Sequence, residues 1–354
     1  MKYKPYNLDY VKQQEKLQRF TVISTFAGGG GSSTGYRLAG GKILAINEFI
    51  HEAQETYRKN YPTTPIIKGD IRGVTGSDIL DRAGIRSGEL DVLDGSPPCS
   101  SFSMAGIRDA GWGKEKKYST TKQRTDDLFF EFARILKGIQ PKFFIAENVA
   151  GLTLGSAANL LGSEQLGLFG EEEETIYHAL VNCGYKVRYK VINAKHFGVP
   201  QSRKRLIIVG VRNDIDFTYR FPKEIGQPPT LRQAFEGITN SQEDLNEANI
   251  DRYAIGTELK KLKLGEQSEK YFSLTKMNPD RYAGTLTQSA GSISAASIAH
   301  WDNRKFTVKE AKRIMSFPDD YYLGETYANK IERLGRAVPP FLMRAVVEQL
   351  PIFK

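Results

Sequence analysis

The chain has little cysteine and no long apolar segment. Its only cysteines are Cys99 and Cys183, which excludes a disulfide framework and a zinc site built from cysteines. No run approaches the roughly 20 apolar residues that span a bilayer, and the polar N-terminus lacks an apolar segment followed by a cleavage site. We therefore expect a soluble cytoplasmic protein that has no membrane partner and holds no metal.

The length and the charge of the chain narrow its class further. At 354 residues it exceeds the usual size of one simple core, which predicts two lobes or one elaborated domain. The formal net charge of +9 favours a polyanionic partner, but many basic proteins bind no nucleic acid. The charge alone therefore does not identify the partner.

The first two thirds of the chain alternate short β-branched runs with helical patterns, which is typical of a mostly parallel sheet covered by helices. From about residue 214 to 304 this rhythm weakens, which predicts a second, irregular lobe. Helical patterns return at 307–316, where Glu310 and Arg313 are expected to form a structural pair, and at 339–350, where the chain is expected to return to the first lobe. The predicted strands are 21–26, 42–47, 92–94, 143–147, 187–192 and 206–211, and the predicted helices between them are 51–60, 126–136 and 175–182.

A glycine-rich turn follows the first predicted strand. Residues 21–35, TVISTFAGGGGSSTG, pass from an apolar strand into four glycines and a polar helix start, so the backbone can approach a ligand closely. Glu48 stands 20 residues beyond Gly28, at the end of the next strand, where a carboxylate can accept hydrogen bonds from ribose hydroxyls. This pair indicates an adenosine-containing cofactor, although a nicotinamide dehydrogenase or a purely structural turn fits the same pattern.

The two cysteines differ in their surroundings. Cys183, in ALVNCGYK, is typical of a buried small apolar residue. Cys99, in DGSPPCSSFS at 94–103, follows a strand and two prolines and has polar neighbours. Cys99 is therefore the candidate nucleophile.

Three segments occur in a telling order along the chain. GSPPC at 95–99, ENV at 147–149 and GVPQSRKR at 198–205 resemble the ordered signature of the cytosine-5 DNA methyltransferase family. The resemblance runs from FAGGGG to GRAVPP, and only the stretch from about 214 to 301 matches no general pattern. It implies an α/β fold in which 1–213 and 305–354 form a Rossmann-like methyltransferase sheet, and 214–304 form a smaller, irregular target-recognition lobe.

The family chemistry fits the residues that carry the resemblance. A thiolate at Cys99 adds to carbon 6 of cytosine, and carbon 5 can then take a methyl group from S-adenosylmethionine. Glu147 is expected to hold ring nitrogen 3, while Arg203 and Arg205, which alternate at the start of a strand, present donors to the base oxygen and a phosphate. The target base must be flipped out of double-stranded DNA.

The remaining site residues are implied by the resemblance. Phe49 is expected to cover the adenine ring and Asp70 to accept from its amino group, while the basic stretch 100–125 is predicted to close over DNA as a lid. The expected cofactor contacts are Phe26, Gly28, Gly31, Glu48, Phe49, Asp70, Ile71, Pro98, Leu128, Arg336 and Val338, and the expected DNA contacts are Ser103, Arg108, Lys116, Lys117, Arg124, Thr285 and Thr287.

The chain departs from the family pattern at two positions. Ser24 stands where many members carry an acid, and Arg336 stands where the usual asparagine lies near the sulfonium of the cofactor. A cation there needs a carboxylate partner. One explanation is that Arg336 swings outward or pairs with a protein acid or the methionine carboxylate, which leaves a normal methyl donor. The other is that it pairs with the extra carboxylate of carboxy-S-adenosylmethionine and the enzyme transfers a carboxymethyl group.

Other classes remain as alternatives. They are a tRNA cytosine-5 methyltransferase of the same fold, a nicotinamide oxidoreductase and a catalytically silent DNA-binding homologue. A silent homologue would ordinarily have lost Cys99 or Glu147, and both are present. We expect a monomer whose partner is duplex DNA, and a cognate restriction endonuclease stays open as a second partner.

Overall fold

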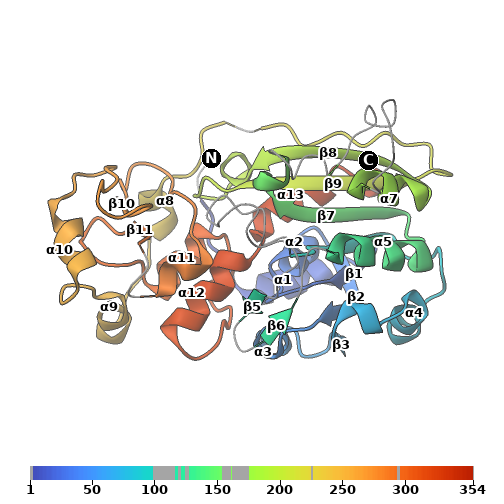
Figure 1. Ribbon diagram of the computed structural model, residues 1–354, viewed down its shortest axis with the longest axis horizontal. Helices are drawn as coiled ribbons and strands as arrows, with labels where there is room; N and C mark the ends of the chain where they lie inside the picture. Colours follow the sequence, from blue (N-terminus) through green and yellow to red (C-terminus); the bar gives the residue numbers. More distant parts are fainter. Residues whose placement is uncertain are drawn as a thin grey trace.

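The computed structural model describes residues 3–98, 116–118, 121–123, 127–153, 161, 175–224, 226–292 and 296–353, with the backbone alone described at 116–118 and 121–123. The molecule has a large lobe built on one sheet and, beside it along the long axis, a smaller lobe of short elements (Figure 1). Helices α11 (Val308–Ile314) and α12 (Tyr327–Arg336) lie between the two (Figure 1). None of the described helices is long and apolar enough to cross a bilayer.

A seven-stranded sheet forms the centre of the large lobe. Its strand order is β3-β2-β1-β4-β7-β9-β8, and only β9 runs against its neighbours, because β7 and β8 both pair with it antiparallel. The predicted α/β class and mostly parallel sheet are confirmed, and among the seven strands of this sheet the prediction missed β3. The strands are β1 (Phe20–Thr25), β2 (Gly41–Glu48), β3 (Ile66–Lys68), β4 (Val92–Gly95), β7 (Phe143–Val149), β8 (Tyr185–Asn193) and β9 (Lys204–Arg212).

Helices cover both faces of this sheet. Successive strand residues point to opposite faces, so Val22 joins the apolar cluster that includes α1, α2, α3 and α13, while Ile23 joins the cluster that includes α4, α5 and α7. The predicted helix 51–60 is α3 as observed. The helices are α1 (Leu8–Glu15), α2 (Gly31–Leu38), α3 (His51–Asn60), α4 (Gly76–Ala83), α5 (Leu128–Ile139), α7 (Ile176–Asn182) and α13 (Pro340–Val347).

The C-terminal segment returns to the large lobe, as the helical pattern at 339–350 predicts. Helix α13 packs on α2 so closely that a Cβ at Gly35 would lie 2.5 Å from the carbonyl oxygen of Pro340. A Cβ at Gly31, the first residue of α2, would likewise lie 2.4 Å from the carbonyl oxygen of Val338. Gly31 and Gly35 of α2 therefore allow the backbone of the C-terminal segment to pack directly on this helix.

The small lobe has its own apolar cluster, which includes Ile250, Leu259 and Leu274. Its elements are too short to give a clear period in the sequence, which explains why 214–304 is irregular in appearance. These elements are α8 (Leu231–Phe235), α9 (Gln242–Ala248), α10 (Ala254–Lys261), β10 (Thr275–Lys276), η6 (Gln288–Gly291) and β11 (Ile298–Ala299).

Helix α11 (Val308–Ile314) corrects the expected pairing of Glu310 with Arg313. Glu310 closes a capping box with Thr307 and forms an ion pair with Arg304 at 2.7 Å. Arg313 instead pairs with Asp319 at 2.8 Å. Both residues serve structure, but each is held by a different segment because tertiary partners outcompete a neighbour on the same helix.

Candidate active site

A cavity of about 720 Å³ opens where the parallel strands of the sheet end. Residues that close or follow β1, β2, β4 and β7 line one side of it, and the end of α12 (Tyr327–Arg336) and η6 line the other. Ligands of open α/β sheets bind at this edge, outside the carboxyl ends of the strands. The cavity is therefore the candidate active site.

The glycine turn after β1 holds a fixed carboxylate at the cavity. The Gly28 amide, in a residue with φ of 54°, donates to Oε2 of Glu48 at 2.7 Å, and the Ile50 amide donates to Oε1 at 2.7 Å. Burial raises the pKa of Glu48, and these two amides oppose the rise. Each oxygen keeps a lone pair for a further donor, which suits the two hydroxyls of a ribose.

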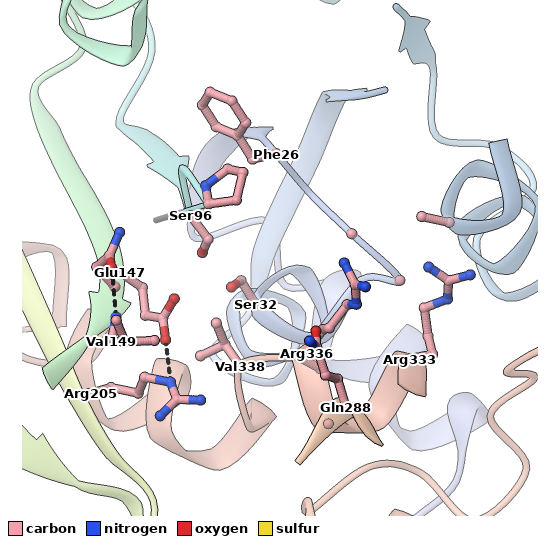
Figure 2. A pocket seen from close by; sticks show the side chains of 18 of the residues that line it. Phe26, Ser32, Ser96, Glu147, Val149, Arg205, Gln288, Arg333, Arg336 and Val338 are labelled. Carbon is pink, nitrogen blue, oxygen red and sulfur yellow. Dashed lines mark hydrogen bonds and ion pairs between the residues drawn. The ribbon is translucent and has the colours of Figure 1, made fainter. Parts of the chain in front are cut away.

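A second buried carboxylate lies at the end of β7. Glu147 accepts from Nε of Arg205 at 2.8 Å, and Figure 2 shows the two side chains pointing toward each other in the cavity. Burial raises the pKa of Glu147, and Arg205, Arg203 and the Ser96 hydroxyl oppose the rise. A carboxyl group with a raised pKa can keep its proton and donate it to a substrate, as a general acid does.

The same strand end also fixes the turn before Cys99. Asn148 donates from Nδ2 to the carbonyl oxygen of Pro97 at 2.9 Å. Pro98, the next residue, lines the cavity. The chain that leads to Cys99 thus starts from a place fixed by β7, although Cys99 itself lies outside the described residues.

Arg203 is almost fully buried, with 1% of its surface exposed. Its guanidinium donates to the carbonyl oxygens of Leu286 at 3.0 Å, Gly335 at 2.7 Å and Ala337 at 3.0 Å. Burial lowers the pKa of Arg203, and the nearby Arg205 lowers it further. Arg203 therefore connects its own segment with two others beside the cavity, the one at Leu286 and the end of α12.

Ser24, where the family resemblance led us to expect an acid, contacts an acid on the neighbouring strand. Ser24 donates to Oδ2 of Asp94 in β4 at 2.5 Å, and the hydroxyl of Tyr36 donates to Oδ1 at 3.0 Å. Burial raises the pKa of Asp94 to about 7, against the effect of these two donors. A buried carboxylate thus lies behind the glycine turn on β4, beside Ser24 of β1.

Comparison with known proteins agrees with this geometry. Residues 20–351 match the family model described as C-5 cytosine-specific DNA methylase. The chain belongs to this family. It is 30% identical to the type II methyltransferase M1.HphI of Haemophilus parahaemolyticus over 93% of this chain and 86% of that protein. It is 31% identical to M.Eco47II of Escherichia coli over 92% and 78% of the two chains.

Solved structures support the fold of this C-5 cytosine-specific DNA methylase. The structure of a Spodoptera frugiperda DNMT2 mutant superposes with a TM-score of 0.67 at 18% identity, covering 95% of this chain and 100% of that chain. The Dnmt2 methyltransferase of S. pombe superposes with a TM-score of 0.65 at 17% identity, covering 93% and 97%. At this identity the likeness establishes the fold.

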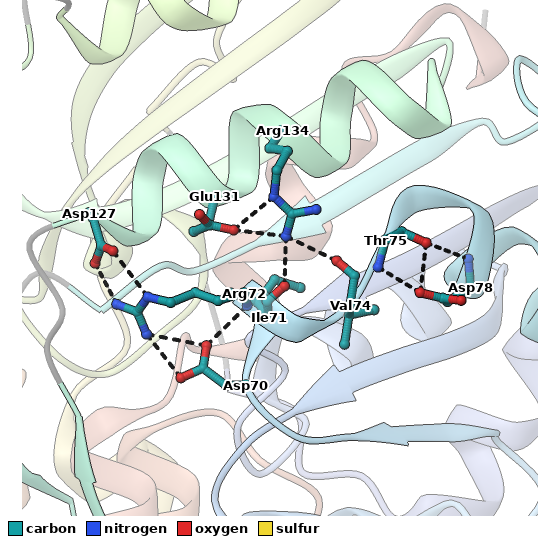
Figure 3. A network of polar contacts seen from close by, with 9 residues as sticks. All are labelled: Asp70, Ile71, Arg72, Val74, Thr75, Asp78, Asp127, Glu131 and Arg134. Carbon is teal, nitrogen blue, oxygen red and sulfur yellow. Dashed lines mark hydrogen bonds and ion pairs between the residues drawn. The ribbon is translucent and has the colours of Figure 1, made fainter.

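Most of the residues predicted for the methylase site do meet at the cavity. Two expected cofactor contacts, Asp70 and Leu128, are not among the described lining residues. Asp70 pairs with Arg72 at 2.9 Å, and Arg72 also holds Asp127 (Figure 3). Leu128 is buried at the start of α5. The predicted residues that line the cavity are Phe26, Gly28, Gly31, Glu48, Phe49, Ile71, Pro98, Glu147, Arg203, Arg205, Thr285, Thr287, Arg336 and Val338.

Several predictions for the methylase fall outside the described residues. These are the nucleophile Cys99 and the DNA contacts Ser103, Arg108 and Arg124. Lys116 and Lys117 lie in β5 (Lys116–Tyr118), which pairs antiparallel with β6 (Thr121–Gln123). Only their backbone is described, so their predicted DNA contacts stay predictions. The predicted lid over 100–125 stays a prediction.

The sequence prediction missed cavity residues on α12 and η6. Glu332, Arg333 and Gln288 line the cavity, and Glu332 forms an ion pair with Nη2 of Arg336 at 2.7 Å. The signal that could have found them is helical spacing, because residues three and four apart share a helix face. In the described part of the chain no group of three or more His, Cys, Asp and Glu residues is placed to hold a metal ion.

Proposed function

We propose that this chain is a DNA cytosine-5 methyltransferase that flips a cytosine out of duplex DNA, adds the Cys99 thiolate to carbon 6 and transfers a methyl group from S-adenosylmethionine to carbon 5. Carbon 5 then loses its proton to solvent and the thiolate leaves carbon 6, which restores the aromatic ring. The observation that carries the proposal is the position of the Glu147–Arg205 pair. It shares one cavity with the Gly28–Glu48 contact and with Pro98, which directly precedes Cys99. A base-binding acid, a ribose-binding acid and the approach to the nucleophile therefore meet within reach of one substrate.

The charges at Glu147 suit the activation of a cytosine. Because burial raises its pKa, Glu147 can hold a proton at ring nitrogen 3 as negative charge develops on the base. The ion pair with Arg205 fixes the direction of its carboxyl group. Arg205 then keeps further donors that can reach the base oxygen, which agrees with the prediction for this residue.

The cavity fits S-adenosylmethionine, and this fit rests on side chains that are present. Glu48 offers both oxygens in a fixed direction, and a Cβ at Gly28 would meet nothing within 4 Å, so the turn borders open space. Phe49 and Ile71 add apolar surface for an adenine ring. When bound, the cofactor would supply an electrophilic methyl group.

Arg336 favours the ordinary methyl donor over the carboxymethyl alternative. Its guanidinium already pairs with Glu332 at 2.7 Å, so a protein acid balances this cation without an extra carboxylate on the cofactor. This is the first of the two explanations that the sequence left open. Carboxymethyl transfer from carboxy-S-adenosylmethionine therefore becomes an outcome of the test.

The substrate is proposed to be duplex DNA, read by residues 214–304. Thr285 and Thr287, at the boundary of the two lobes, line the cavity, and Thr285 is fixed by a 2.8 Å hydrogen bond to the carbonyl oxygen of Ser202. The relatives M1.HphI and M.Eco47II are named type II methyltransferases, which supports a restriction endonuclease as partner. A tRNA substrate is the alternative from another class, and a competition between folded RNA and duplex DNA distinguishes the two.

The test is nucleoside mass spectrometry of DNA and tRNA from cells that express the full chain. Cys99→Ser is compared with Cys183→Ser, whose thiol contacts the carbonyl oxygens of Ala133 and Ala179 far from the site chemistry. We expect 5-methylcytosine in DNA with the wild type and Cys183→Ser, and none with Cys99→Ser. Appearance of 5-carboxymethylcytosine supports the carboxymethyl alternative, methylation of tRNA alone supports the RNA enzyme, and no product in either pool overturns the proposal.

A further inference from the structure

Helix α12 directs two arginines into the cavity, and they differ in whether a protein carboxylate neutralises their charge. Figure 2 shows Arg333 and Arg336 rising from this helix, on the side of the cavity away from Glu147. Arg336 has the Glu332 ion pair at 2.7 Å. For Arg333 no carboxylate in the described part of the chain lies within ion-pair distance, and its buried Nε has no hydrogen-bond partner there.

The stem of Arg333 lies directly on the glycine turn. A Cβ at Gly29 would come within 2.7 Å of Cδ of Arg333 and 2.8 Å of Cγ. Gly28 and Gly30 have positive φ angles of 54° and 91°, whereas Gly29 is not among the positive-φ residues. A side chain at 29 would therefore be opposed by the stem of Arg333 and not by the backbone conformation. The turn and the arginine therefore fit each other as a pair.

The charges near Arg333 leave room for an additional anion. Burial lowers its pKa and Arg336 lowers it further, while Glu48 is the strongest of the acids that oppose the fall. Both oxygens of Glu48 already accept backbone amides, from Gly28 and Ile50, so this carboxylate is held toward the turn. Arginine keeps its proton in proteins, so the guanidinium retains donors that face the cavity.

We propose that Arg333, whose stem packs on Gly29, binds a carboxylate of the cofactor. This inference rests on the proposed function, since the ligand is a cofactor of the S-adenosylmethionine type. An arginine at this place matches a planar carboxylate with two parallel donors. The carboxylate is either that of the methionine part or the extra one of carboxy-S-adenosylmethionine, and the two sources are separated by the choice of ligands.

The experiment measures binding, without catalysis, by titration calorimetry of the full chain. The ligands are S-adenosylmethionine, its decarboxylated form, which lacks the methionine carboxylate, and carboxy-S-adenosylmethionine. Arg333→Met keeps the apolar stem over Gly29 and removes the guanidinium. Lys330→Met is the matched control, because it removes a cation from the same helix outside the cavity lining.

We expect the wild type and Lys330→Met to prefer S-adenosylmethionine over the decarboxylated form by about tenfold or more, and Arg333→Met to lose most of that preference. If Arg333→Met instead lowers only the relative affinity for carboxy-S-adenosylmethionine, the extra carboxylate is the partner, and the inference stands. If both affinity ratios are the same in Arg333→Met as in the wild type, Arg333 only packs on the turn, and the inference is overturned.

Two further outcomes are informative. If Arg333→Met does not fold, the wild-type ratios decide, because a chain that binds all three ligands equally recognises no carboxylate and the inference falls. If the wild type binds none of the three ligands, the proposed function itself fails. The experiment thus distinguishes failure of the inference, in which the ligands bind without a contribution from Arg333, from failure of the proposed function, in which none of them binds.

Discussion

Among single residues, Ser24 and Asp94 form a buried polar contact between two strands of the sheet. The two side chains are joined by a 2.5 Å hydrogen bond between β1 and β4, both fully or nearly fully buried. A carboxylate at 24 beside the existing one would bring two buried like charges together, and one of them would have to take up a proton. We therefore expect this contact to accommodate only one ionised carboxylate.

We predict that Ser24→Asp lowers the free energy of unfolding by about 2 to 4 kcal/mol at pH 8 and by less at pH 5, where the two carboxylates share a proton. The double variant Ser24→Asp with Asp94→Ser should recover much of this loss, because it restores one acid and one hydroxyl. Urea denaturation of the four proteins measures the coupling. If the changes in unfolding free energy of the two single variants simply add up in the double variant, the two positions are not coupled and the prediction is wrong.

The raised pKa of Asp94 also predicts a dependence of stability on pH. Its pKa is about 7 in the folded chain and close to 3.8 when unfolded, so the folded state keeps the proton longer. Its contribution to stability is therefore full below pH 4 and is lost as the pH rises through 7. Asp94→Asn should be more destabilising at pH 5 than at pH 8, by about 1 to 3 kcal/mol. Parallel stability curves for the two proteins from pH 5 to 8 would argue against this.

Among the elements, the short helix η1 (Ile71–Gly73) shows how a contact outside the cavity can set its shape. Arg72 bridges Asp70 at 2.9 Å and, through Nε, Asp127 at 3.0 Å, just before α5 (Figure 3). Arg134 of α5 donates to the carbonyl oxygen of Ile71 at 2.8 Å. Since Ile71 lines the cavity, these contacts hold the proposed adenine side of the site.

We predict that Arg72→Met weakens binding of S-adenosylhomocysteine by about threefold to tenfold, because partly exposed ion pairs contribute modestly and act here only through Ile71. Arg86→Met is the matched control, since Arg86 forms an exposed pair with Glu89 at 2.8 Å away from the cavity. Titration calorimetry measures both variants. If the two variants bind the ligand equally well, the contacts of Arg72 with Asp70 and Asp127 do not affect the cavity.

The sequence predicted the elements whose pattern is local and missed those that depend on distant contacts. Helix α3 was predicted from its own residues, and the strands of the sheet from their apolar runs. Helix α12, YANKIERLGR, was missed because few of its residues are apolar, and it is fixed instead by contact with η6. A Cβ at Gly335 would lie 2.4 Å from the backbone of Thr287.

The same division applies to the site. Glu48, Glu147 and Arg205 follow from motifs at strand ends, where the sequence order fixes the place in the sheet. Arg333 meets Gly29 only after the C-terminal segment has folded back, so no local pattern contains that contact. The sequence likewise gave no reason to connect Ser24 with Asp94, because their contact depends on the pairing of β1 with β4.

In the whole molecule, Arg203 connects parts of the chain that lie far apart in the sequence. It stands just before β9 and donates to Leu286, next to η6, and to Gly335 and Ala337, at the end of α12. These segments also form the wall of the cavity opposite the sheet. This buried guanidinium therefore links the two sides of the candidate active site.

We predict that Arg203→Lys lowers the free energy of unfolding by about 2 to 4 kcal/mol, because an ammonium cannot reach three carbonyl oxygens in this fixed arrangement and leaves buried acceptors unpaired. Arg188→Lys, on the neighbouring strand β8, is the matched control, since the Arg188 guanidinium makes one long contact of 3.4 Å with the carbonyl oxygen of Tyr219. Urea denaturation measures both. If Arg203→Lys unfolds like Arg188→Lys but loses methylation, the buried arginine acts on the base rather than on the backbone, and the catalytic role predicted from the sequence replaces the structural one.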